Sequence, residues 1–143
     1  MLKVYYTLSS RVFPDEGSLF LSEYRRKKLS SVKAPVLRGQ MIAAELLLNR
    51  AVRENFPDLK LPLRVMTGEG GKPYFEDCPL FFSLSHSGPY AACALADYEI
   101  GLDIQERSAV RESVVSRCFS ESEREYLRQS SDGDGTFTEI WCL

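Results

Sequence analysis

The sequence predicts an α+β fold in which strands flank one long, largely apolar helix. Residues 2–8 alternate in the manner of a strand, and residues 35–55 carry apolar side chains at helical spacing over a wide stripe. Residues 90–96, YAACALA, have no charge and mostly small side chains, which is typical of a strand covered on both faces. A chain of 143 residues is long enough for one domain that buries roughly two-thirds of its unfolded surface.

The remaining elements follow from turn residues and periodicity. Pro57 and Pro62 end the long helix, and Ser85–Pro89 predicts a turn. A hairpin at 97–99 would set residues 90–96 against the next strand. We also expect helices over about 18–29, 107–118, 121–129 and 137–143, short strands over 63–66 and 99–104, and a flexible loop over 130–135.

The composition excludes several classes of protein. The chain has 18 Lys and Arg against 20 Asp and Glu, so its net charge of -2 gives no general attraction to nucleic acid or to an anionic membrane. No apolar run approaches the roughly 20 residues that span a bilayer, and the N-terminus lacks the pattern of a secretion signal. We therefore expect a cytoplasmic location. The four cysteines form no C-x-x-C pair, which favours reduced structural thiols.

Polar chemistry is concentrated in residues 82–105. If residues 99–104 form a strand, alternation places Asp103 and Gln105 on one face, opposite the apolar side chains. A carboxylate beside an amide oxygen is a partial site for Mg²⁺, which also takes water and phosphate oxygens as ligands. The alternative is that Asp103 caps a turn or pairs with a lysine.

Other polar residues each have a structural and a functional interpretation. His86 is the only histidine, so no second imidazole can join it in a cluster, and a lone histidine between serines is more often structural. Glu123 stands three residues after Ser120, where it could complete a capping box or act in catalysis. The basic run that includes Arg25 and Arg38 is either a solvated helix face or a set of phosphate partners.

Five short motifs occur in a fixed order along nearly the whole chain. They are Gly71-Lys72-Pro73, Ser85-His86-Ser87, Ile100-Gly101-Leu102-Asp103-Ile104, Phe119-Ser120-x-x-Glu123 and Trp141. In this order they resemble the signature of the 4'-phosphopantetheinyl transferases, of the larger surfactin-synthetase-activator type. Members of that type have two similar α+β halves with coenzyme A between them. The resemblance implies a complete first half over residues 1–98 and an incomplete second half over residues 99–143.

The resemblance also implies an enzymatic activity and its partners. Phosphopantetheine would pass from coenzyme A to a serine of an acyl or peptidyl carrier protein in a Mg²⁺-dependent reaction. Asp103 and Glu123 would be catalytic, and Asp103 with Gln105 would hold the metal, although many relatives have an acidic residue in place of Gln105. The residues implied in coenzyme A binding are Arg25, Arg38, Lys72, Pro73, Ser85 and His86.

The sequence departs from the family signature at Trp141. The signature continues as W-x-x-K-E, whereas this sequence ends Trp141-Cys142-Leu143, which predicts a truncated second half with impaired transfer. Three interpretations stay open: a fragment of a full transferase, a natural remnant that binds coenzyme A or a carrier protein without turnover, or an unrelated α+β binding protein. Exposed sheet edges would favour self-association.

Overall fold

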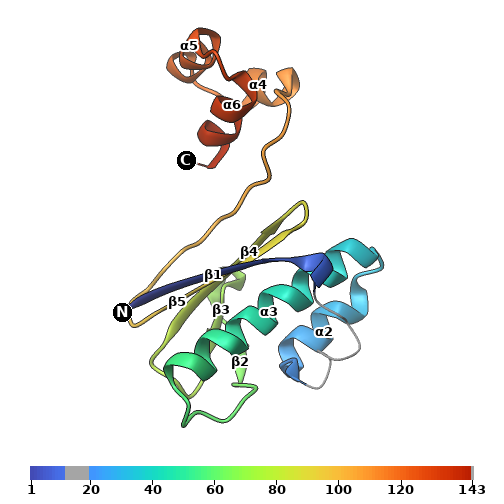
Figure 1. Cartoon of the computed structure of the whole chain (residues 1–143), viewed down its shortest axis with the longest axis vertical. Coiled ribbons are helices and arrows are strands. Elements are labelled where there is room, and N and C mark those ends of the chain that lie inside the picture. The colour runs from blue at the N-terminus through green and yellow to red at the C-terminus, as the bar shows by residue number, and fades with distance from the viewer. Residues whose placement is uncertain (12–19, 143) are drawn as a thin grey trace. The chain divides into compact units, whose positions relative to one another are not determined.

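The computed structural model describes residues 1–11 and 20–142, whose helices and strands are drawn in Figure 1. The chain divides into two compact units, Met1–Ile104 and Gln105–Leu143. The first unit contains all the strands that the structure describes, and the described part of the second contains only helices. The fold is therefore of the predicted α+β class, while the predicted domain boundary at residues 98 and 99 stays a prediction.

The first unit is built on an antiparallel sheet with the order β1-β5-β4. These strands are β1 (Leu2–Leu8), β5 (Tyr90–Ala96) and β4 (Phe81–Ser87). β4 and β5 form a hairpin in which Gly88 adopts a φ of +52°, a conformation that glycine permits at little cost. β5 is the central strand, and every residue in it after Tyr90 is buried, as its small apolar side chains predict.

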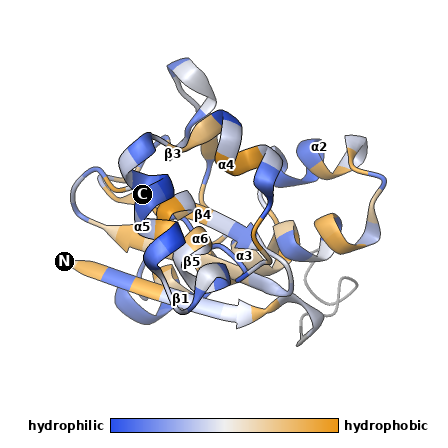
Figure 2. Cartoon of the chain, turned by 90° about the horizontal axis from the view of Figure 1, so that it is seen from above, coloured by the Kyte–Doolittle hydropathy of each residue, from blue (hydrophilic) through white to orange (hydrophobic). Residues whose placement is uncertain are grey.

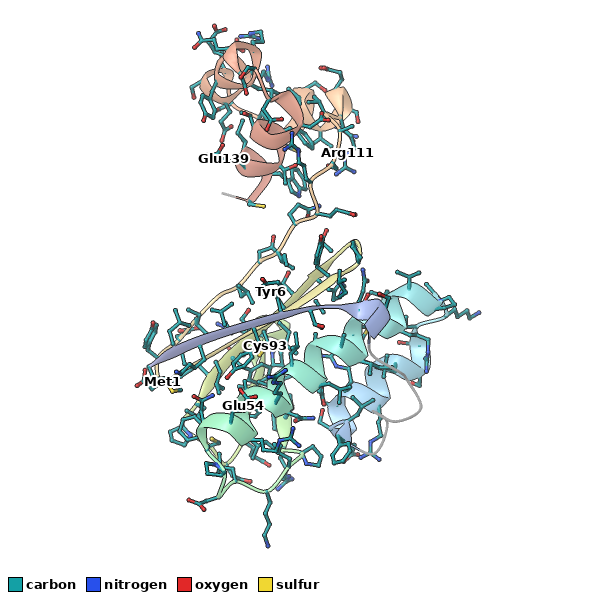
Figure 3. The ribbon with its side chains drawn as sticks, viewed as in Figure 1. Met1, Tyr6, Glu54, Cys93, Arg111 and Glu139 are labelled. Carbon is teal, nitrogen blue, oxygen red and sulfur yellow. The ribbon has the colours of Figure 1, made fainter. Side chains whose placement is uncertain are left out.

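The helix α3 (Pro35–Asn55) covers one face of this sheet. Pro35 stands in the first turn, where the missing N–H costs nothing. The core between the helix and the sheet contains Leu48 and Val52 from α3 together with Cys93 and Leu95 from β5. On the other face of the sheet, Tyr6 is 75% exposed and points away from α3 (Figure 3).

A shorter helix, α2 (Glu23–Ser31), packs on α3 through a second cluster formed by Leu21, Leu29, Met41 and Ile42. Ser22 caps α2, since its hydroxyl accepts a hydrogen bond from the backbone N–H of Arg25 at 3.2 Å. The helix was predicted to begin near Ser18, which lies outside the described residues. The basic run of α2 is blue in the hydropathy colouring of Figure 2.

Smaller elements complete the first unit. A two-stranded ribbon pairs β2 (Val65–Thr67) with β3 (Pro73–Phe75) in antiparallel register. Between them lies the short 3-10 helix η3 (Glu69–Gly71), and another, η1 (Ser9–Arg11), follows β1.

Three predictions about the polar region were wrong. The predicted hairpin at 97–99 does not form among the described residues, because β5 pairs with β1 and β4 instead of with the segment that follows it. Ser85, His86 and Ser87 end the strand β4, and the turn begins only at Gly88. Residues 99–104 form no strand, because the backbone N–H groups of this segment bond to side-chain hydroxyls of β4 instead of to its backbone.

The second unit contains α4 (Glu112–Cys118), α5 (Glu121–Gln129) and α6 (Gly133–Cys142). Its core is a separate cluster of Val115, Phe119, Phe137 and Ile140. The predicted flexible loop over 130–135 is shorter than expected, because α6 begins at Gly133.

The four cysteines are free thiols, as predicted. Cys93 lies within the sheet, where burial raises the pKa of its thiol to about 12 (Figure 3). Among the described helices, none combines the length and the apolar character needed to cross a bilayer.

Candidate functional site

A cleft of about 250 Å³ opens in the first unit where α2, α3, β4 and the start of β3 meet. We call it the basic cleft. Its lining comprises Tyr24, Arg25, Lys28, Met41, Ala44, Lys72, Pro73, Phe82, Ser83, Leu84 and His86. Four residues of the predicted coenzyme A site are among them: Arg25, Lys72, Pro73 and His86.

A larger hollow, of about 540 Å³, lies in the second unit, but it contains none of the predicted site residues. Its two arginines are already engaged. Arg124 donates to the backbone carbonyls of Val115 and Ser116, and Arg128 pairs with two glutamates of its own helix. The basic cleft is the better candidate for an anion site.

Helix α2 supplies the cations on one side of the cleft. Arg25 and Lys28 are three residues apart, so they lie on the same face of the helix. The ring of Tyr24 makes cation–π contacts with both, with the ammonium of Lys28 4.8 Å and the guanidinium carbon of Arg25 5.9 Å from the ring centroid. All three side chains line the cleft.

Arg25 is buried at the base of the cleft, where it forms an ion pair with a residue that the sequence did not single out. Its Nε donates to Oε2 of Glu45 on α3 at 2.9 Å, and both side chains are almost completely buried. Oε1 of Glu45 accepts the backbone N–H of Ser22 at 2.6 Å. One carboxylate therefore holds both the start of α2 and its arginine.

His86 lines the cleft from β4. The pKa of its imidazole is lowered from the usual value, first by partial burial and second by the positive charge of Arg25. A bound phosphate would offset the repulsion from Arg25 and raise this pKa. The imidazole can thus gain a proton as an anion enters.

Lys72 and Pro73 complete the opposite wall, at the point where η3 leads into β3. The ammonium of Lys72 pairs with Glu99 at 3.1 Å, and both side chains are largely exposed. Such an exposed pair contributes little to stability, so a phosphate can compete for the lysine at small cost.

Asp103 is held beside β4 by a serine. The hydroxyl of Ser85 donates to Oδ1 of Asp103 at 2.5 Å and accepts the backbone N–H of Ile104 at 3.1 Å. Ser83 accepts the N–H of Leu102 in the same way, at 3.0 Å. Serines two residues apart on one side of the strand thereby fix residues 102–104 along its outer edge.

Asp103 and His86 consequently approach β4 from different sides. Ser85 and His86 are consecutive residues of a strand, so their side chains point to opposite faces. The predicted coenzyme A contact of Ser85 stays a prediction, and its hydroxyl is engaged with Asp103.

The structure gives Arg38 a different setting from the predicted one. Its Nη1 donates to the backbone carbonyls of Leu29 and Val32, the second at 3.2 Å, and so completes the C-terminal end of α2. Arg38 is not in the lining of the basic cleft. Its assignment as a phosphate partner stays a prediction that this geometry does not favour.

Gln105 and Glu123 belong to the second unit, whereas Asp103 belongs to the first, so their predicted grouping stays a prediction. The side chain of Gln105 donates to the carbonyl of Glu106 at 3.3 Å. Glu123 completes the predicted capping box, because its Oε2 accepts both the backbone N–H and the hydroxyl of Ser120 at 2.7 Å. These hydrogen bonds lower the pKa of Glu123. Its catalytic role stays a prediction.

The donor set for a metal is partial. Asp103 offers an exposed carboxylate with one oxygen bonded to Ser85, and the described residues contain no cluster of three His, Cys, Asp or Glu side chains suited to a cation. An ion with a single protein carboxylate would fit the habit of Mg²⁺, which keeps water and phosphate oxygens as its other ligands.

Comparison with known proteins extends the match seen in the motifs. Residues 99–143 match the family model of the 4'-phosphopantetheinyl transferase superfamily. The chain is 26% identical over 127 residues to the 4'-phosphopantetheinyl transferase Sfp of Bacillus subtilis, an alignment that covers 87% of this chain and 57% of that protein. It is 27% identical over 106 residues to the transferase gsp of Aneurinibacillus migulanus, covering 71% and 44% of the two chains.

A third relative is more similar over a shorter range. The transferase AcpT of Salmonella typhimurium is 42% identical over 73 residues, which is 49% of this chain and 34% of that protein. The chain spans about half the length of the curated relatives that it matches.

Proposed function

We propose that this chain, which belongs to the 4'-phosphopantetheinyl transferase superfamily, binds coenzyme A in the basic cleft and takes part in moving phosphopantetheine to a serine of an acyl or peptidyl carrier protein. The observation that carries the proposal is the gathering of Arg25, Lys28, Lys72 and His86 around one cleft. Coenzyme A is rich in phosphate, and cationic N–H donors are the groups that bind phosphate oxygens best.

Each kind of side chain that lines the cleft would act on the phosphates of coenzyme A in a different way. The guanidinium and the ammonium groups neutralise phosphate oxygens, and His86 donates a hydrogen bond that strengthens when its imidazole is protonated. Tyr24 makes cation–π contacts with the two cations of α2 that line the cleft. Together these groups orient the diphosphate for attack, which supplies most of the catalysis in phosphoryl transfer.

The reaction forms one phosphorus–oxygen bond and breaks another. The serine hydroxyl of the carrier attacks the phosphorus that bears pantetheine, and 3',5'-ADP leaves with the bridging oxygen. The serine proton passes to a carboxylate, directly or through water. Asp103 and Glu123 are the candidates. As the family resemblance implies, Asp103 with Gln105 would hold Mg²⁺, whose charge would further neutralise the phosphate oxygens.

A second function is the binding of coenzyme A without turnover. It is favoured by the lining of the basic cleft, which contains the cations but not the carboxylate of Asp103. Binding and transfer must therefore be measured separately.

The test mixes the chain with Mg²⁺, coenzyme A and an apo acyl carrier protein, and follows the mass of the carrier by mass spectrometry. We expect weak coenzyme A binding and slow addition of phosphopantetheine, which Asp103→Asn abolishes because the amide carries no charge and is a poor base. Glu54→Gln, which changes an exposed carboxylate paired with Arg50 on α3, is the matched control and should leave the rate unchanged.

An unchanged rate in Asp103→Asn would remove this carboxylate from the mechanism. Coenzyme A binding with no transfer to the carrier would instead support the second function, and a chain that does not bind coenzyme A at all would refute both.

A further inference from the structure

We propose that Glu45 is a positioning residue of the basic cleft, which grips Arg25 by its Nε edge and thereby presents the Nη edge of the guanidinium to a phosphate ligand. The inference rests on the proposed function, because the phosphate ligand is taken to be that of coenzyme A. It assigns a task to a buried carboxylate that would not itself touch the ligand.

The carboxylate of Glu45 is fixed from two directions. Glu45 is 3% exposed and Arg25 is 7% exposed. Oε2 of Glu45 accepts from Nε of Arg25 at 2.9 Å, and Oε1 accepts from the backbone N–H of Ser22 at 2.6 Å. With both oxygens engaged, the carboxylate cannot rotate without losing a charge-assisted hydrogen bond.

Arginine is suited to serve two anions at once. Its guanidinium is planar and rigid, with five N–H donors spread over its edges. Among the residues that the structure describes, only Glu45 accepts a hydrogen bond from this side chain, and it does so at Nε. The N–H groups at the far edge thus remain for a ligand in the cleft, which Arg25 lines.

Stability alone is a weak explanation for this pair. Removing two charges from water is costly, and buried ion pairs elsewhere have been replaced by apolar side chains of similar volume without loss of stability. Orientation explains more, because an unpaired arginine on α2 would have many rotamers and would pay the entropy of ordering when the ligand binds.

Two physical accounts predict opposite signs for the loss of the carboxylate charge. If Glu45 acted only through its net charge, Glu45→Gln would remove a negative charge near the cleft and tighten the binding of an anion. If Glu45 positions Arg25, the same change weakens binding. The glutamine amide has a single oxygen for the two donors, Ser22 N–H and Arg25 Nε, so its NH₂ group must face one of them.

The experiment measures the Kd of coenzyme A by isothermal titration calorimetry for the wild-type chain, Glu45→Gln, Arg25→Met and the double variant. We expect Glu45→Gln to raise the Kd of coenzyme A roughly tenfold, which is the effect of losing about one charge-assisted hydrogen bond. In the Arg25→Met background the same change should alter Kd less than twofold, because the residue through which Glu45 acts is gone. Tighter binding by Glu45→Gln, or equal weakening in both backgrounds, would overturn the inference.

Two further variants separate positioning from folding. Ser22→Ala removes the hydroxyl that caps α2 but keeps the Glu45–Arg25 pair, so it should leave Kd within about twofold. Arg25→Lys keeps the charge, but an ammonium facing Glu45 has no second edge for a ligand, so binding should weaken roughly tenfold.

If Glu45→Gln does not fold, the Kd of coenzyme A for Arg25→Lys tests the inference instead. A wild-type Kd in Arg25→Lys would refute it. A wild-type chain that does not bind coenzyme A would refute the proposed function. Wild-type binding that Arg25→Met weakens and Glu45→Gln does not would refute only the positioning role.

Discussion

The hydroxyls of Ser83 and Ser85 accept hydrogen bonds that backbone carbonyls would accept between two strands of a sheet. Their hydroxyls accept the N–H groups of Leu102 and Ile104, and Ser85 also donates to Asp103. The segment is thus fixed beside β4 without being a strand. A serine can accept and donate at once, which lets one side chain align both the backbone and the carboxylate.

Replacing Ser85 by alanine should loosen this segment. The change removes the acceptor of the Ile104 N–H and the donor to Asp103, and one such hydrogen bond is worth about 1 kcal/mol. We expect the Ile104 amide to exchange its hydrogen roughly fivefold faster, as measured by NMR-detected hydrogen exchange. Ser85→Thr, which keeps the hydroxyl, is the control, and equal exchange rates in Ser85→Ala and wild type would contradict the role given to this serine.

The sequence predicted part of the grouping that the structure shows. Four residues that the motifs implied in coenzyme A binding, Arg25, Lys72, Pro73 and His86, line one cleft, while their binding roles stay predictions. Lys28 was missed, although its position three residues after Arg25 on a helix could have revealed it. Nothing in the sequence pattern distinguished Glu45 from other acidic residues on helix surfaces, because its partner lies 20 residues away.

Arg38 has a different environment from the one that the resemblance implied. Instead of an anion, backbone carbonyls at the end of a neighbouring helix accept its hydrogen bonds. Sequence alone does not reveal which helix end lies beside it.

Among the elements, α3 organises the first unit because it has two buried faces. One packs on the sheet, and the other packs on α2, which carries Arg25 and Lys28 of the basic cleft. This arrangement explains the wide apolar stripe that the sequence shows over residues 35–55.

Shortening a buried side chain of α3 should cost far more stability than shortening an exposed one. Leu48 is 2% exposed, whereas Val36, on the same helix, is 70% exposed. Leu48→Ala should lower the free energy of unfolding by about 2–5 kcal/mol through lost contacts and a cavity. Val36→Ala should change it by less than about 0.5 kcal/mol. Urea denaturation measures both, and similar losses in the two variants would contradict the packing described for α3.

The secondary structure was predictable where a regular pattern of apolar residues runs over a long segment. The prediction was wrong where side chains, instead of backbone groups, pair with the segment. Residues 2–8, 35–55 and 90–96 form the predicted elements. Residues 99–104 have the composition of a strand, but the serines of β4 take the hydrogen bonds that a ladder would need. The alternation of apolar residues does not reveal that side-chain hydroxyls accept these hydrogen bonds in place of backbone carbonyls.

Each of the two units has its own hydrophobic core. The clusters around α3 lie within Met1–Ile104, and the cluster around Phe137 lies within Gln105–Leu143. Phe137 is 1% exposed and stacks on Phe119 with the ring centroids 5.6 Å apart.

Phe137→Ala should therefore destabilise the second unit alone, by about 3–5 kcal/mol. We expect α4, α5 and α6 to lose helical structure while the amides of β5 keep their protection against hydrogen exchange. Exchange measured residue by residue separates the two units, and equal loss of protection in β5 would show that they unfold as one.

The proposal that coenzyme A occupies the basic cleft has a direct reporter, because His86 is the only histidine in the sequence and lines that cleft. The decisive measurement is the pH titration of the His86 ring signals by NMR, without and with saturating coenzyme A. Without ligand, burial and Arg25 should keep the pKa of His86 below its usual value. Phosphate close to the ring should raise this pKa, and by linkage coenzyme A should bind more tightly as the pH falls through it. Coenzyme A that binds without changing the His86 signals or their pKa would contradict the account.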